Sequence, residues 1–207
     1  MREATMERAM HGLINRAIEG FVRDSYGRET WGRLTRRLAL GVAEFEAMLH
    51  YDDALTAKLL DGVAEQLGKQ RHEVLEDIGT YLVSHPNAEA LRRLLRFGGG
   101  TFGEFLQSLD DLPARARLAV PDLEVPRLEL REHAPDHFSL SVQAPTAAMP
   151  PLGHVMIGLL RALADDYGTL VLLEHRGRRA TEEIVEIRLL EPDHAAGRDF
   201  DLGARAG

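Results

Sequence analysis

Apolar residues recur at every third or fourth position through most of the first 120 residues, which is the spacing that places them on one face of an α-helix. Before residue 85 this pattern predicts helices over about 10–26, 29–38, 51–67 and 70–84. Gly27 and Gly68 follow the first and third of these helices, where glycine commonly ends a helix. Asp52–Asp53 is expected to cap the start of the third.

Two further helical stretches are predicted in the same half of the chain. Asn87 is expected to cap a helix that the glycines at 98–100 end. Thr101 then opens the longest stretch, 102–119, which contains Pro113. Proline removes one backbone donor, so the helix should be kinked or interrupted there.

After residue 120 the pattern changes to alternation of apolar and polar positions, which is typical of β-strands with one buried face. Strands are predicted over 127–132 and 138–142 with a turn at 133–137, a helix over 152–167, and strands over 169–175 and 183–190 joined by a turn at 176–179. Helices followed by strand–strand–helix–strand–strand predict an α+β fold: an N-terminal helical subdomain, then a four-stranded antiparallel sheet with one helix across its face.

The length of 207 residues fits one domain that buries about 70% of the surface of its unfolded chain. We expect a single domain over 10–191, with a helical part at 10–120 and a sheet part at 121–191. The tail, 192–207, is rich in Gly, Ala and Asp and is expected to be disordered.

Composition narrows the function classes. The chain has no cysteine, which excludes disulfides, thiolate metal sites and cysteine nucleophiles. Its net charge of −8, with basic residues interleaved among acids, argues against binding to nucleic acid or to an anionic membrane surface. There is no long apolar run and no apolar segment near the start, so we expect neither a membrane span nor a secretory signal, and a cytoplasmic location.

Three motif matches are interpreted as structural. The glycine pattern at 98–103 fits a dinucleotide-binding fingerprint by letter, but a predicted helix rather than a strand precedes it, so a helix–helix turn is favoured. The histidines at 133 and 137 read as a solvated hairpin tip, and His72 with Glu76 as an exposed pair on one helix. No nucleophile–base pair is apparent, so an enzyme is not expected.

Five short segments stand in a recognisable order: MHGLIN at 10–15, YDD at 51–53, EVLEDIG at 73–79, FLQSLD at 105–110 and MIGLL at 156–160. Together they resemble the H-NOX family, the haem nitric-oxide/oxygen-binding domains related to the sensor domain of soluble guanylate cyclase. The resemblance extends over 10–191. It implies a helical subdomain and a sheet subdomain that enclose a porphyrin.

The residues that hold haem in the family are missing from this sequence. The family's iron-ligating histidine corresponds to Pro113, and no histidine lies between His85 and His133. The family's propionate-binding Tyr-x-Ser-x-Arg motif corresponds to Pro-Thr-Ala-Ala-Met at 145–149. No Arg, Lys or Tyr occurs between Glu132 and Arg161. The resemblance therefore implies a divergent member in which haem is not bound in the family's manner.

The same resemblance assigns residues to the wall of the pocket: Ile14 on the first helix, Pro126 at the position of a proline that packs beside the porphyrin, and Val155 at a distal position. Val155 is apolar and would offer no hydrogen bond to bound oxygen. His154, beside it, is the first candidate for a substitute iron ligand, ahead of His11 and His50. No metal site is otherwise expected.

We therefore expect a non-catalytic sensory or regulatory domain in signal transduction, without haem as a cofactor, that acts through a protein partner. By resemblance the partner is a histidine kinase, a diguanylate cyclase or a nucleotide cyclase. Two alternatives stay open: a haem-binding nitric-oxide sensor in which His154 replaces the lost ligand, and a binder of another apolar molecule.

Overall fold

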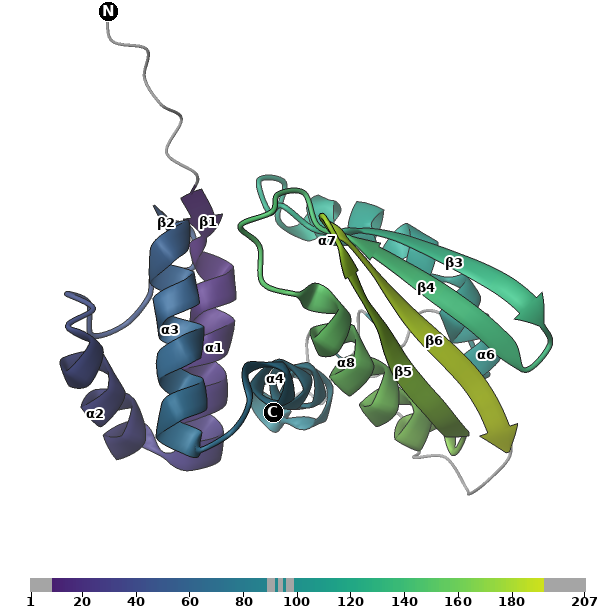
Figure 1. Cartoon of the computed structure of the whole chain (residues 1–207), viewed down its shortest axis with the longest axis horizontal. Helices are drawn as coiled ribbons and strands as arrows, with labels where there is room; N and C mark the ends of the chain where they lie inside the picture. Colours follow the sequence, from purple (N-terminus) through teal and green to yellow (C-terminus); the bar gives the residue numbers. More distant parts are fainter. Residues whose placement is uncertain (1–8, 89–91, 93–94, 96–98, 192–207) are drawn as a thin grey trace, which may run out of the picture.

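The computed structural model describes residues 9–88, 92, 95 and 99–191. The first part contains β1 (Ala9–His11), α1 (Gly12–Tyr26), α2 (Arg28–Leu38), β2 (His50–Asp52), α3 (Asp53–Leu67), α4 (Arg71–Ser84) and the 3-10 turn η1 (Pro86–Ala88). The rest contains α6 (Phe102–Gln107), the 3-10 turn η2 (Leu109–Asp111), α7 (Leu112–Ala119), β3 (Arg127–Ala134), β4 (His137–Gln143), α8 (Leu152–Tyr167), β5 (Leu170–Arg179) and β6 (Glu182–Glu191). Helices α1–α3 lie on one side of α4, and α8 with the sheet lies on the other (Figure 1). The predicted α+β fold is confirmed.

Helix ends in the first part follow the predicted signals. Asp52 caps α3 by accepting the backbone N–H of Ala54 at 2.8 Å. Gly68 ends the helix in the left-handed conformation at φ 63°, which glycine adopts without steric cost. The helices bury a cluster that includes Trp31, Leu34 and Leu60.

The expected helix over 10–26 begins later than predicted. Residues 9–11 instead form β1, which pairs antiparallel with β2, so the helix predicted over 51–67 also begins later, at Asp53. Pairing with β2 keeps residues 9–11 extended, and the His11 ring caps the helix that follows by accepting the N–H of Leu13 at 3.2 Å.

The long helical stretch predicted over 102–119 is interrupted, as its proline indicated. It divides into α6, η2 and α7, and Pro113 lies in the first turn of α7. A proline is tolerated there because amides in the first turn have no partner within the helix. Asn87 belongs to η1, and most of the helix it was expected to cap lies outside the described residues, as does the 192–207 tail.

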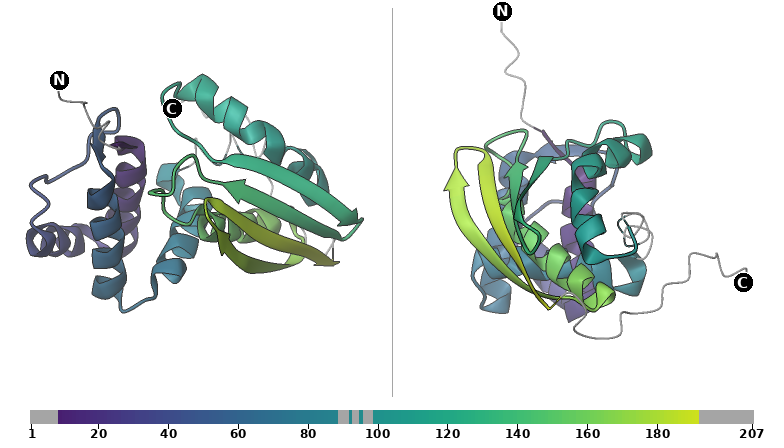
Figure 2. Two further views of the ribbon diagram at one scale, coloured as in Figure 1. Left: turned by 45° about the horizontal axis from the view of Figure 1, so that its top comes forward. Right: turned by 90° about the vertical axis from the view of Figure 1, so that its right-hand side faces the viewer.

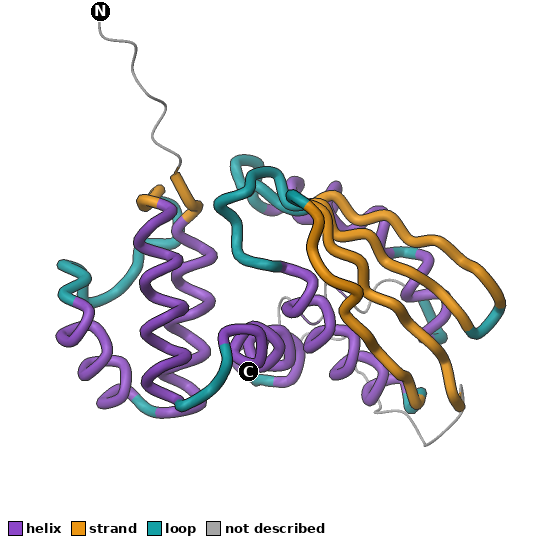
Figure 3. The backbone as a smooth tube through the Cα atoms, viewed as in Figure 1, coloured by secondary structure: helices purple, strands orange, loops and turns teal. Residues whose placement is uncertain are grey.

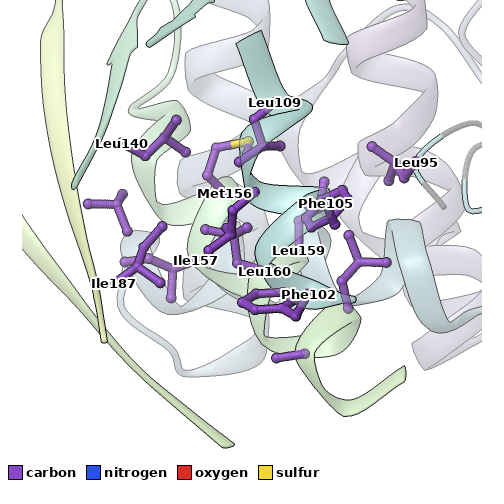
Figure 4. Packing of buried hydrophobic residues seen from close by; sticks show 14 of the residues in the cluster. Leu95, Phe102, Phe105, Leu109, Leu140, Met156, Ile157, Leu159, Leu160 and Ile187 are labelled. Carbon is purple, nitrogen blue, oxygen red and sulfur yellow. The ribbon is translucent and has the colours of Figure 1, made fainter. Parts of the chain in front are cut away.

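The four strands form one antiparallel sheet in the order β3-β4-β6-β5. Figure 3 shows these four strands on one side of the molecule, apart from the short β1–β2 pair, and Figure 2 shows helices against one face of the sheet. Phe138, Leu140 and Val142 alternate along β4 and are buried. Residues of α6, which precedes the predicted boundary at 120, pack in the same cluster as the strands and α8 (Figure 4).

The predicted turn at 176–179 is wrong, because β5 continues through Arg179. The chain reverses at Ala180–Thr181, where Ala180 has φ 56°. Gly177, at φ 95°, lies in an irregularity between His175 and Arg178, so the glycine forms a bulge inside the strand. The two arginines beyond it are the register partners of two acids of β6.

Helices α4 and α8 cross at unusually close range through two glycines. A Cβ added at Gly158 would lie 1.8 Å from the backbone oxygen of Glu76, and one added at Gly79 would lie 2.0 Å from the oxygen of Val155. The Thr80 hydroxyl donates to the Gly158 carbonyl at 3.3 Å. This backbone contact holds the helical side and the sheet side of the molecule together.

Within the described part of the chain, the helices are too short or too polar to cross a membrane.

We predict that Gly158→Ala lowers the free energy of unfolding by about 2 kcal/mol or more, because the new methyl group has no space and α8 must shift. The matched control is Gly103→Ala in α6, where an added Cβ meets nothing within 4 Å. Alanine favours helix over glycine by up to about 1 kcal/mol, so the control should be neutral or stabilising. Urea unfolding measures both, and equal effects of the two substitutions would contradict the close crossing.

Candidate functional site

A cavity of about 710 Å³ opens between α1 and α4. Its apolar wall includes Ile14, Leu82 and Leu123, while charged side chains of α1 line another part. The volume is in the range that holds small organic molecules. Of the predicted pocket residues, Ile14 is the one that lies on this wall as the described residues form it.

Glu19 is the buried charge of the site. Its side chain is fully inaccessible, yet it receives hydrogen bonds from Arg23 at 2.6 Å, Arg16 at 2.9 Å and the N–H of Phe45 at 2.8 Å. These donors compensate the desolvation of the carboxylate. The guanidinium of Arg23 also contacts Glu44 at 2.7 Å, and these two acids raise its pKa. Guanidinium groups therefore line the cavity in a fixed arrangement.

A second polar group connects α1 with α4. Asp24 accepts hydrogen bonds from the Tyr81 hydroxyl at 2.6 Å and from Asn87 at 2.9 Å. Burial alone would raise the pKa of Asp24, but these bonds and nearby His85 outweigh it, and the pKa is lowered. Burial and the bond to Asp24 raise the pKa of Tyr81. The carboxylate is therefore held ionised against a protonated phenol.

Pro113, at the position that the resemblance assigns to the iron ligand, is buried in the first turn of α7. Its ring has no donor atom for a metal. Nearby polar groups serve the backbone: Asp110 accepts the N–H of Leu130 at 2.8 Å, and Arg115 donates to the Ser108 carbonyl at 3.2 Å. Pro126 is half-buried in the connection before β3.

An arginine reaches the 145–149 segment from β5, which the sequence reasoning missed. Arg178 donates to the carbonyls of Ala147 at 3.3 Å and Met149 at 3.4 Å, and its Nε donates to Ala180 at 2.9 Å. Met149 is itself buried against Met10. The guanidinium thus holds the loop backbone at the place where the resemblance expects a propionate clamp.

His154 lies in a cluster of polar side chains where α4, α8, β5 and β6 meet. Its Nδ1 is 3.3 Å from Glu76, and its ring stacks on His175 at 4.2 Å. His175 in turn bonds the buried carboxylate of Glu183 at 2.9 Å. Burial, and then the neighbouring His175, lower the pKa of His154 although Glu76 opposes the shift. The ring is thereby favoured in its neutral form.

His154 and Val155 are not among the described residues that line the cavity, and Val155 packs against the helical core. The assignment of His154, Val155 and Pro126 to one pocket with Ile14 stays a prediction. Glu19, Arg178 and Glu183 were not singled out from the sequence. Only Glu19 carried a signal, because it shares the helix face of apolar Ile18 and Val22, where a charge is unexpected.

The discounted motifs have structural roles. Thr101, within the glycine-rich segment, forms a reciprocal capping box with Glu104 at the start of α6. His133 bonds Ser139 at 2.8 Å across the β3–β4 hairpin, and His137 bonds Glu186 of the neighbouring strand β6 at 2.8 Å. The exposed His72 lies beside the ring of His154 at 5.3 Å, while Glu76 turns to His154 and Arg161 rather than to His72.

The sequence of this chain is similar to the sequences of soluble guanylate cyclases. The chain is 29% identical over 119 residues to soluble guanylate cyclase gcy-31 of Caenorhabditis elegans, which is 56% of this chain and 17% of that protein. It is 22% identical over 121 residues to soluble guanylate cyclase 89Db of Drosophila melanogaster, 58% of this chain and 18% of that protein. The chain thus spans less than a fifth of the length of these relatives.

Solved structures share the fold at low identity. An H-NOX protein from S. oneidensis in the Fe(II)NO state has a TM-score of 0.71 and 18% identity, covering 88% of this chain and all of the other. A point mutant of T. tengcongensis H-NOX has a TM-score of 0.69 and 19% identity, covering 88% of this chain and 99% of the other. The family model described as Haem-NO-binding matches residues 11–175. From this match over most of its length, the chain belongs to the Haem-NO-binding (H-NOX) family of sensor domains.

Proposed function

We propose that this chain is a non-catalytic regulatory domain of the H-NOX family that does not hold haem through the family's iron ligand and that signals through a protein partner. One observation carries the proposal: Pro113 is buried in the first turn of α7, and no histidine lies between His85 and His133. Without an imidazole on that side, the usual axial bond to iron has no donor.

The residues at the family's propionate-binding position also do not fit haem. Arg178 is the guanidinium that reaches the 145–149 segment, and its donors already bond three backbone carbonyls. A propionate that took these donors would compete with the loop carbonyls for them. The packing of Met149 against Met10 further joins the sheet side to the helical side at this end of the molecule.

The alternative of a substitute ligand meets a cost at His154. Its Nδ1 faces Glu76, and its ring stacks on His175. Ligation through Nε2 would leave the contact of Nδ1 with Glu76 intact, but it would require space for a porphyrin beside a ring that is stacked on His175. We therefore favour the haem-independent function over haem ligation by His154.

A second candidate function is binding of an apolar molecule that carries an anionic group. The cavity between α1 and α4 supports it, because apolar side chains and the guanidinium group of Arg28 share its wall. Arg16 and Arg23 also line it but are paired with Glu19 and Glu44. Guanidinium groups form charge-assisted hydrogen bonds with carboxylate and phosphate. Such a ligand, rather than nitric oxide or oxygen, would then be the signal.

The partner is proposed from the relatives. Both are named as guanylate cyclases, and this chain covers less than a fifth of each. A nucleotide cyclase, diguanylate cyclase or histidine kinase, whether separate or in the same polypeptide, is the class of protein on which we propose that the domain acts.

We predict that the full chain, purified from haem-supplemented cells, lacks stoichiometric haem, because Pro113 replaces the family's axial imidazole and Arg178, the arginine beside the 145–149 segment, is bonded to the loop. Absorption spectroscopy before and during hemin titration measures this. The expected result is a change without saturation at one equivalent.

The same titration on two variants tests the alternative. A one-to-one Soret band in the parent that His154→Ala abolishes and His133→Ala leaves intact would contradict the proposal and support ligation by His154. His133, exposed on the hairpin, is the matched control.

For the second candidate function, we predict saturable one-to-one binding of an amphipathic anion, with 1-anilinonaphthalene-8-sulfonate as the fluorescent probe. Ala17→Phe adds a ring to a residue that lines the cavity and should weaken binding at least 10-fold. Ala114→Phe adds the same ring at an exposed position of α7 and should leave it unchanged. Equal affinities in both variants would show that the probe binds elsewhere.

A further inference from the structure

Three metal-ligating side chains from separate segments converge beside the start of α1. His11 is in β1, His50 is in β2, and Asp122 lies in the connection after α7. One ligand atom from each lies within 4.8 Å of the other two. The ribbon register places His11 directly opposite His50, with ring centroids 5.2 Å apart.

The His11 ring carries a buried polar atom without a hydrogen-bond partner. Its side chain is 1% exposed, and Nε2 makes no hydrogen bond. The other ring nitrogen, Nδ1, accepts the N–H of Leu13 at 3.2 Å, so the ring is oriented with Nε2 toward Asp122. Buried polar atoms are normally satisfied, so an unpaired one aimed at a carboxylate requires an explanation.

The separation of the ligand atoms matches metal coordination better than a hydrogen bond. His11 Nε2 lies 3.5 Å from Asp122 Oδ2, beyond the usual range for N–H···O bonds. Two ligands at zinc distances of about 2.0–2.1 Å in a tetrahedral site are roughly 3.3 Å apart. A small movement of the exposed His50 and Asp122 side chains toward His11 would bring all three ligand atoms to distances suited to one metal ion.

We propose that His11, His50 and Asp122 form a binding site for a divalent transition metal ion of the Zn²⁺ class. Two imidazoles and one carboxylate suit such ions, whereas Ca²⁺ and Mg²⁺ prefer sites built from oxygen alone. Three protein ligands leave a fourth position for water. When Nε2 binds the metal, the ring proton resides on Nδ1 and the cap bond to Leu13 is given up.

The bound ion would join the β1–β2 ribbon to the segment after α7. Asp122 precedes Leu123, and His11 lies three residues before Ile14, and both of these apolar residues line the cavity. The metal would therefore fix one side of the cavity wall. The site itself depends on neither haem nor the proposed function.

The test is calorimetric titration of Zn²⁺ into the untagged, chelator-treated full chain. The expected result is one equivalent bound, with affinity reduced at least 10-fold in His50→Ala and in Asp122→Ala. Both residues are exposed, so these variants should keep the fold, which circular dichroism checks. Co²⁺ in place of Zn²⁺ should give an absorption band of tetrahedral character in the parent and not in the two site variants.

His133→Ala is the matched control, because His133 is exposed and lies 5.0 Å from a second ring, that of His137, on the hairpin. It should bind Zn²⁺ as the parent does. The proposal is overturned if the parent binds no equivalent of Zn²⁺, or if both site variants retain the parent's affinity. Neither result bears on whether hemin binds, so the two proposals fail separately.

Discussion

The close crossing of α4 and α8 is the constraint on which the arrangement of this domain depends. Backbone meets backbone at Gly79 and Gly158, where no larger residue fits. Val74 and Leu75 of α4 belong to the helical core, whereas Met156 of α8 belongs to the core under the sheet. One pair of helices thus joins two hydrophobic cores that would otherwise be separate, and their spacing fixes how the α1 side faces the sheet.

Most of the fold could be predicted from the sequence because its local signals agree with the tertiary structure. The helix that ends at Gly68 and the interruption at Pro113 follow from backbone chemistry that needs no distant partner. The errors arose where pairing decides the outcome. The ribbon before α1 requires a partner strand that follows α2 in the chain, and the bulge at Gly177 lies within the pairing of β5 with β6.

Less of the candidate site than of the fold could be predicted from the sequence. The absence of histidine between His85 and His133, on which the proposal about haem rests, could be read without coordinates. The roles of Arg178 and Glu183 could not, because an exposed strand arginine and an acid at a strand start look like ordinary solvent-facing charges. Glu183 is in fact buried, and its burial depends on the packing of α8 over β6. Chemistry assembled from distant segments becomes visible only after folding.

Arg178 has a thermodynamic consequence for any acidic molecule that approaches the 145–149 segment. Its Nε and both Nη groups each donate to a main-chain carbonyl, so a carboxylate that takes any of these three bonds competes with the loop for it. Ligand occupancy and loop order are then linked quantities, and each changes the free energy of the other by the same amount. The loop carbonyls therefore oppose the binding of an acidic ligand at Arg178, and a ligand that binds there loosens the loop.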